Sequence, residues 1–526
     1  MNVFELKEKF SRLREIRSQY EGTWSSIRDL VRPNVPDFHG SSTANTRPTI
    51  KIYDGTAPWA LEQLAAGLIS MNSNSADRWF SLQAPEVIPE NLGREGELWL
   101  DEVASLIFHE YQKPSSGFGS SLHEAFLDLA GFGTGAQFQD YDSRTGSLMF
   151  RTYPLADCWI DENINGHVDT LFRKTVLTYR QIQQGFKLGP GSKIAQIGAK
   201  EPGRKFTIIH GVFPRSDRSM SRADARNMEY ASFFFCEELD EILHEGGYSV
   251  FPYHVPRWTK LAGEVYGQSP AGNALPDIMM VNQMARTLLS AAQKASDPPV
   301  VVPNSGFLMP IRTSPGSMIF KEPGTESPEP FPYHGQPQFT LEMINYHRSQ
   351  ITRSFYIEHL LRERKKERQT IMEIQDERME MMQQLGPVNG RLQTELFGPC
   401  LNRSLQLLMD NRRIPPPPFA GNLRAHYTSP AARSQMATKS IGMRRFVEEI
   451  TPLANIDQTL VDSINVPELV RLSAIYEDIS PKILRSDEEI EEIQRQRQES
   501  QQAQEQAGLA ESMAKAAKDM SQAHRL

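Results

Sequence analysis

The feature that most constrains the fold is a proline- and glycine-rich stretch, residues 298–339, with a helical pattern on each side of it. The helix before it is predicted over 276–295, with Pro276 in its first turn, and Asp297-Pro298-Pro299 ends it because proline cannot continue a helix. The helix after it begins near residue 341. The expected apolar side of this second helix carries Leu341, Ile344, Ile351 and Phe355.

These two helices, each of about 20 residues, would span roughly 30 Å. The sequence therefore predicts a long helical hairpin with an elaborated tip. Such a hairpin is hard to pack inside one compact monomer. It is natural if copies of the chain stand side by side around an axis.

The chain before this hairpin changes from a helical to a β pattern near residue 136. Apolar residues recur at helical spacing in the first quarter, whereas short β-rich runs fill about 136–258, with one helix near 178–186. Hairpin turns are predicted at 142–146 (DSRTG) and at 244–247 (HEGG). Together these patterns predict an α+β fold that is mainly helical.

The chain after the hairpin carries a dense run of charge, RERKKER. Its basic residues are Arg362, Arg364, Lys365, Lys366 and Arg368. Taken alone, such a run is most often a solvated helix face or loop, and the other interpretation is a loop that contacts phosphates.

A long helix is then predicted from about 370 to 411. Gly386 and Pro387 interrupt it, and glycine followed by proline inside a helix predicts a kink. Shorter helices follow to about 485. The tail from 486 is rich in Glu and Gln, and it is either a solvated helix in an oligomer or disordered.

Composition limits the classes of function. A chain of 526 residues exceeds the roughly 250–300 that one hydrophobic core supports, so several packing units are expected. A net charge of −8 argues against tight binding of nucleic acid, but is compatible with a surface along which DNA slides. No apolar run approaches the ~18–20 residues of a membrane span, so no membrane anchor is expected.

No catalytic, metal or cofactor site is predicted. Three cysteines lie far apart, and the histidines do not form a ligand pattern. Gly131-Phe-Gly133-Thr-Gly135 is interpreted as a helix C-cap and turn, because these glycines end a helix instead of opening one. Asp54 and Asp161 are interpreted as caps, and the pair Asp161-Glu162 as solvated surface. We therefore expect no enzymatic activity.

A collinear series of motifs resembles the head-to-tail connector (portal) proteins of short-tailed bacteriophages, the podoviruses. It covers the chain to about residue 485. The motifs are WSSIRDLVRP, IYDGTAP, LAAGLISMNSNSADRWFSL, YPLAD (153–157), VLTYRQ (176–181), Arg257-Trp258, EVYG (264–267), SPAG (269–272), LPDIMMVNQM, TIMEIQDERMEMMQQLGP and RLQTELFGPCLNR. The tail from 486 does not match the family pattern.

The resemblance implies a portal-type architecture. Its expected parts are a wing at 1–272, stem helices at 273–297 and 340–361, a clip at 298–339, a channel (tunnel) loop at 362–369, a kinked wing helix at 370–412, wing and crown helices at 413–485, and a polar tail at 486–526 that extends the crown or is disordered.

By the same resemblance, about twelve subunits form a ring around a channel at one capsid vertex. The ring is assembled in the host cytoplasm and remains in the virion. Double-stranded DNA passes through it without sequence specificity during packaging and ejection, and the five basic residues of the channel loop face the DNA.

The implied partners are the terminase motor, the tail adaptor, and the major capsid and scaffolding proteins. Two alternatives stay open. One is another non-enzymatic virion or assembly protein, such as a scaffold or adaptor. The other is a packaging enzyme, which would need a phosphate loop or a carboxylate cluster for metal ions.

Overall fold

The computed structural model divides the chain into two compact units. Unit 1 comprises Met1–Trp79 and His109–Asn411, and unit 2 comprises Phe80–Phe108 and Arg412–Leu526. This division does not follow the wing, stem and clip boundaries, which stay predictions. The described residues are 2–38, 52–74, 78–83, 89–189, 191–218, 224–301, 337–360, 384–418, 424–427, 430–454 and 465–476, with scattered residues in 320–330 and 483–512.

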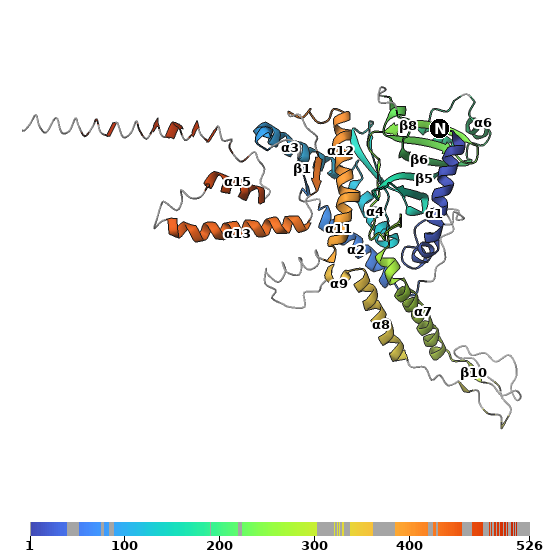
Figure 1. The fold of residues 1–526 in the computed structure, drawn as a ribbon. Helices are drawn as coiled ribbons and strands as arrows, with labels where there is room; N and C mark the ends of the chain where they lie inside the picture. The colour runs from blue at the N-terminus through green and yellow to red at the C-terminus, as the bar shows by residue number, and fades with distance from the viewer. Residues whose placement is uncertain are drawn as a thin grey trace, which may run out of the picture. The chain divides into compact units, whose positions relative to one another are not determined.

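A five-stranded antiparallel sheet with the order β4-β5-β6-β7-β8 organises one side of unit 1 (Figure 1). Helix α1 (Val3–Leu30) packs on it, because Leu6, Phe10 and Leu13 recur at helical spacing and meet Trp159 and Phe172 of the sheet. The Phe10 and Trp159 rings meet edge to face, with 4.9 Å between centroids. The strands are β4 (Cys158–Glu162), β5 (Val168–Thr178), β6 (Lys205–Pro214), β7 (Tyr230–Cys236) and β8 (Glu241–Tyr248).

The predicted turn at 244–247 is wrong, because these residues lie inside β8. The turn that joins β7 to β8 is at 237–240, where Asp240 has a φ of 52°. Gly247 serves a different purpose: a Cβ atom there would lie 2.3 Å from the carbonyl oxygen of Ala225, in the short turn η2 (Ala225–Asn227). The glycines therefore mark a close backbone approach within a strand. Asp161 is likewise in strand β4, and its interpretation as a cap is wrong.

A smaller sheet with the order β3-β2-β9 lies in the same unit. Its turn at 142–146 is confirmed: the Asp142 carboxylate accepts a hydrogen bond from the backbone N–H of Arg144 at 2.9 Å, and Gly146 has a φ of 66°. Its strands are β2 (Gln137–Asp142), β3 (Ser147–Thr152) and β9 (Tyr253–His254), and a single 3-10 turn, η1 (Leu155–Asp157), precedes β4.

Helices α2 (Thr56–Asn72) and α4 (Phe118–Phe132) pack against each other beside this sheet. The glycine-rich end of α4 is confirmed as a C-cap, since Gly133 has a φ of 84° and donates its N–H to the carbonyl of Leu129. A Cβ atom on Gly133 would lie 2.2 Å from the carbonyl oxygen of Gly267. Glycine is therefore required for both conformation and space.

Further helices complete unit 1. Between β5 and β6 the chain forms α5 (Tyr179–Gly185) and α6 (Lys193–Lys200). Its last helical segment is α11 (Gly386–Leu392), a π-helical turn η3 (Gln393–Phe397) and α12 (Gly398–Asp410), which packs on β2 and β3.

In unit 2, strand β1 (Phe80–Gln83) pairs antiparallel with β12 (Arg424–Tyr427), and α13 (Pro430–Ala454) packs on α15 (Val466–Tyr476). The range 413–485 is thus not made of helices alone, as predicted, because β12 completes a sheet with a strand far away in sequence. Helix α3 (Pro89–Gln112) begins in unit 2 and ends in unit 1.

Candidate functional site

The predicted hairpin exists as two helices that lie side by side and leave the body of unit 1 (Figure 1). They are α7 (Pro270–Ser296) and α8 (Pro337–Ser354). At their far end β10 (Val300–Val301) pairs with β11 (Glu329–Pro330). Most of the predicted clip at 298–339 lies outside the described residues.

Both helices have different starts from those predicted. Helix α7 begins at Pro270, because Ser269 caps it by accepting a hydrogen bond from the N–H of Gly272 at 2.8 Å. Pro276 therefore lies inside the helix and not in its first turn. The end at Ser296, before Asp297, is confirmed.

The second helix is shorter than the predicted 340–361. Helix α8 ends at Ser354, and Tyr356 adopts a φ of 59° before a short helix α9 (Ile357–Leu360) begins. The Tyr356 ring lies 6.0 Å from that of Trp258, and Phe355 is fully buried. Packing of these two aromatic side chains thus breaks a helix that the apolar pattern would let continue.

The half of the hairpin near the body is firmly anchored. One face of α7 is buried at Ala271, Ala274, Ile278 and Val281, and one face of α8 at Ile344, His347 and Ile351. The Nδ1 atom of His347 lies 2.8 Å from the carboxylate of Asp277, which ties the two helices together. The backbone N–H of Tyr53 donates to the side-chain oxygen of Asn282 at 2.7 Å.

Asp54 joins the hairpin to α2. One of its oxygens accepts a hydrogen bond from the N–H of Thr56 at 3.0 Å, which confirms its predicted capping role. The other accepts two from the guanidinium of Arg348, at 2.6 and 2.9 Å. Burial alone would raise the pKa of Asp54, but the hydrogen bonds from Thr56 and Arg348 lower it. Asp54 is therefore a charged anchor at neutral pH.

The half of the hairpin away from the body has no such support. None of the described residues from Asn282 to Ser296 is buried. The hairpin exposes large apolar side chains in both halves: Met279 at 53%, Met280 at 47% and Tyr346 at 57% near the body, and Leu289 at 50% in the outer half. A helix pair with apolar side chains on its outer surface is typical of a surface that another protein covers. Leu341, on the expected apolar side of the second helix, is also exposed.

The five basic residues predicted as the channel loop, Arg362, Arg364, Lys365, Lys366 and Arg368, lie outside the described residues. The described chain stops at Leu360, after α9, and resumes at residue 384. A turn at Leu385 precedes α11, which begins at Gly386 with Pro387 in its first turn. The bend relative to 370–383 stays a prediction.

The π-helical turn η3 meets a buried cation that the sequence does not predict. Arg257 is 1% exposed, and its backbone N–H and guanidinium donate to the carboxylate of Glu395 at 2.8 and 2.7 Å. The guanidinium also binds Glu162 at 2.7 Å, and Lys260 lies at the same distance from Glu162. The pair Asp161-Glu162 is therefore not simply solvated surface, because Glu162 is part of this buried ion cluster.

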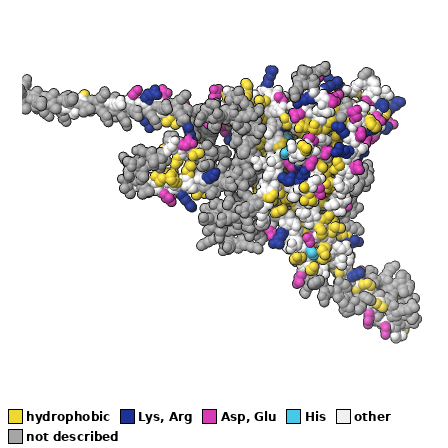
Figure 2. Space-filling model, in the orientation of Figure 1, with side chains coloured by type: hydrophobic (Ala, Val, Ile, Leu, Met, Phe, Trp, Pro, Cys, Tyr) yellow, Lys and Arg dark blue, Asp and Glu magenta, His cyan; other side chains and the backbone are white. Residues whose placement is uncertain are grey.

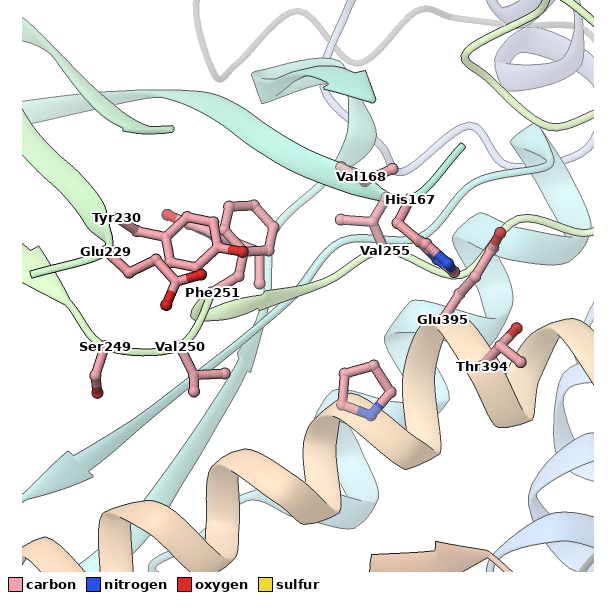
Figure 3. A pocket seen from close by; sticks show the side chains of 12 residues that line it. His167, Val168, Glu229, Tyr230, Ser249, Val250, Phe251, Val255, Thr394 and Glu395 are labelled. Atoms are coloured by element: carbon pink, nitrogen blue, oxygen red, sulfur yellow. The ribbon is translucent and has the colours of Figure 1, made fainter. Parts of the chain in front are cut away.

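Unit 1 contains a pocket of about 290 Å³ beside this cluster (Figure 3). Its ionisable residues include His167, Glu229 and Glu395, but Glu229 lies across the pocket from His167, and Glu395 is held by Arg257. These groups do not converge as the acid, base and nucleophile of a catalytic site would.

Two kinds of feature are absent from the described residues. Three or more His, Cys, Asp or Glu do not come together there as a metal site. No helix in the described part of the chain is long and apolar enough to cross a membrane.

Comparison with known proteins shows the family. A family profile described as "Bacteriophage head to tail connecting protein" matches residues 4–484. A "Probable portal protein" of Bordetella phage BPP-1 is 28% identical over 524 residues, covering 96% of this chain and 92% of its own. A "Portal protein" of Salmonella phage epsilon15 is 25% identical over 538 residues, covering 98% and 95%. One solved chain, from the virion of a native gene transfer agent particle, matches at 10% identity with a TM-score of 0.38, covering 81% of this chain and 88% of its own.

The chain belongs to the bacteriophage head-to-tail connecting protein family, and its curated relatives are phage portal proteins. The resemblance drawn from the motifs is thereby confirmed. The family match ends at residue 484, next to the limit of about 485 expected from the sequence.

Proposed function

We propose that this chain is the subunit of a portal ring of about twelve copies, in which the α7–α8 hairpins stand side by side around a DNA channel. One observation carries the proposal: the hairpin exposes large apolar side chains along its length, Met279 and Met280 near the body and Leu289 in the outer half of α7, which has no buried residue. Burying such side chains contributes roughly 1.5–3 kcal/mol each, so neighbouring hairpins would stabilise one another.

The ring prediction can be tested with Met280→Asp combined with Leu289→Asp. Buried carboxylates in the contact are unfavourable, so we expect rings to be lost and the mass to fall to that of single chains or small assemblies. Electron microscopy and native mass spectrometry give the subunit number directly. Gln283→Asp puts a similar charge on the same helix without removing an apolar contact. Wild-type protein that forms no ring at any concentration would contradict the proposal.

We further propose that double-stranded DNA passes through this ring without sequence specificity, and that the basic side chains at 362–368 contact its phosphates. Because the chain as a whole is acidic, with a net charge of −8, the remaining wall would hold DNA weakly and let it slide. Helices α7 and α8 carry four basic residues, Arg286, Lys294, Arg348 and Arg353, and two acidic ones, Asp277 and Glu342, and Arg348 is paired with Asp54.

Replacing all five basic residues, Arg362, Arg364, Lys365, Lys366 and Arg368, by alanine is expected to leave ring assembly intact and to reduce DNA packaging and retention at least tenfold, because phosphate contacts are lost. The measurement is the amount of nuclease-protected DNA per particle. A control for charge removal away from this loop replaces three exposed arginines of the body, Arg12, Arg144 and Arg151, by alanine. Equal packaging by both variants would remove the channel-loop assignment.

The remaining parts of the proposal concern partners. The tip of the hairpin would dock the terminase motor and later the tail adaptor, and the body would contact the major capsid and scaffolding proteins. The ring would assemble in the host cytoplasm and remain at one vertex of the virion. Family membership and the form of the hairpin support these assignments. A structural role without catalysis also fits the pocket geometry.

A further inference from the structure

A strongly basic segment connects β5 to β6, far from the hairpin. Between Tyr179 and Lys205 the chain has six basic side chains and one acidic one, Glu201, in a protein whose net charge is −8. We call these residues the α5–α6 basic surface. The basic side chains are Arg180, Lys187, Lys193, Lys200, Arg204 and Lys205.

The α5–α6 basic surface is held rigidly by its own small core. Ile182 of α5 and Ile194 of α6 are buried with Phe206, Ile208 and Cys236 of the sheet. The two helices also fit closely, because a Cβ atom on Gly198 would lie 2.2 Å from the ring of Tyr179. Its charged side chains therefore project from a fixed support.

All six basic side chains are exposed, and few of them have local partners. Lys193 donates to the carbonyl of Leu239 at 3.0 Å, in a turn that also carries the acidic residues Glu237, Glu238 and Asp240, and Arg204 lies 3.7 Å from Glu201. Within the part of the chain that the structure describes, Arg180, Lys187, Lys200 and Lys205 have no carboxylate at ion-pair distance. Figure 2 shows dark-blue side chains at the edge of the molecule where Figure 1 places α6.

The composition of this surface indicates what it binds. Lys193, Gln196 and Lys200 lie at i, i+3 and i+7 on the exposed side of α6, so lysine and amide donors form one stripe. The described residues 179–205 include no exposed large apolar side chain. Stable protein interfaces are anchored by aromatic and Arg side chains and are depleted of Lys, whereas DNA backbones are bound by Lys, Arg and amide donors.

We propose that the α5–α6 basic surface binds the phosphate backbone of double-stranded DNA outside the channel. Figure 1 places α6 at the opposite end of unit 1 from β10, so this contact is separate from the hairpin tip. The inference goes beyond the proposed function, since a channel alone needs no basic outer surface. Binding is independent of sequence and falls steeply with salt, because it rests on release of counterions.

The test uses full-length protein and covalently closed circular duplex DNA, which cannot be threaded through a channel. Lys187→Glu, Lys193→Glu and Lys200→Glu are combined in one variant. The control combines Arg12→Glu, Arg144→Glu and Arg151→Glu, which changes the net charge equally. Affinity is measured by electrophoretic mobility shift from 50 to 200 mM salt, and electron microscopy and thermal melting verify assembly and folding.

We expect the α5–α6 variant to bind at least about tenfold more weakly than the control, and the slope of log affinity against log salt to fall by about 2.7 for three lost phosphate contacts. Equal affinity and slope in the two variants would overturn the proposal. The proposal would also be overturned if the wild type bound a poly-glutamate peptide through this surface and did not bind DNA. The partner would then be an acidic protein. If the wild-type protein forms no rings, the proposed function is rejected. The DNA affinities of the α5–α6 variant and its control can still be compared in that case.

Discussion

Replacing Arg257 by alanine is expected to lower the free energy of unfolding of unit 1 by about 3 kcal/mol. Removing one member of a buried ion pair typically costs about 3–5 kcal/mol, because the other charge stays buried without compensation. We expect the lower end of this range. Glu162 keeps Lys260 at 2.7 Å, and Glu395 keeps Arg391 at 3.3 Å.

A double-mutant cycle distinguishes the ion cluster from simple loss of packing. Arg257→Met combined with Glu395→Gln removes both charges at similar volume, and we expect it to be less destabilised than the sum of the single variants Arg257→Met and Glu395→Gln. Urea unfolding of assemblies matched in size gives the free energies. If the double variant is as unstable as the sum of the single ones, the coupling between Arg257 and Glu395 is negligible and the cluster does not hold η3 to the sheets.

Acid is expected to destabilise unit 1 through two buried histidines, in a range where few carboxylates titrate. Burial, helped by the charge of Arg403, lowers the pKa of His254 to about 3. Burial also holds the pKa of His210 well below its ordinary value, with Arg173 and His244 acting in the same direction. Both rings are closely packed: His254 Nε2 lies 2.8 Å from Gln139 Oε1, and His210 stacks on Phe234 at 4.0 Å.

The sign of this effect follows from proton binding. An unfolded histidine, with a pKa near 6.5, takes up a proton below that pH, whereas native His254 does not until the pH approaches 3. The stability it contributes is therefore complete above pH 6.5 and is lost as the pH falls. Between pH 6.5 and 4.5 the loss is about 2 kcal/mol for His254, and His210 adds a loss of the same sign.

Asp128 acts in the opposite direction, because burial, opposed by the charge of Arg32, raises its pKa to about 6. Its native form takes up a proton before its unfolded form does, which favours folding as the pH falls. For this reason the pH dependence of the unfolding free energy is compared between a variant and the wild type.

We expect His254→Gln, which keeps a hydrogen-bond donor, to lose less unfolding free energy than the wild type between pH 6.5 and 4.5, by about 2 kcal/mol. His167→Gln, at an exposed histidine, is the control substitution. Urea unfolding at the two pH values measures this difference. Parallel pH profiles for wild type and His254→Gln would show that His254 takes up its proton at the same pH in the native and unfolded protein, and would contradict the prediction.

The long elements of this fold follow from sequence periodicity. The stripe of Phe10 and Leu13 predicts α1, and the β-rich runs predict β2, β3, β6 and β7. The failures occur where two distant backbones meet. Gly246 and Gly247 have the composition of a turn, yet they lie in β8 because they pair with Ser232 and Ala231 of β7, and Gly247 leaves room for the chain at Ala225. Strand β12 has no strong pattern of its own, since pairing with β1 defines it.

The features of the candidate site also fall into those set by local sequence and those set by tertiary packing. The sequence by itself determined the helical hairpin, its stop at Asp297, the basic run at 362–368 and the family, because apolar spacing, proline and collinear motifs are local properties of the chain. Only the tertiary structure decided that Asp54 binds Arg348, that Glu395 binds Arg257, and that the outer half of α7 is left uncovered. Each of these depends on residues far apart in sequence meeting or failing to meet, and such pairing is set by packing of the whole unit, which no local pattern encodes.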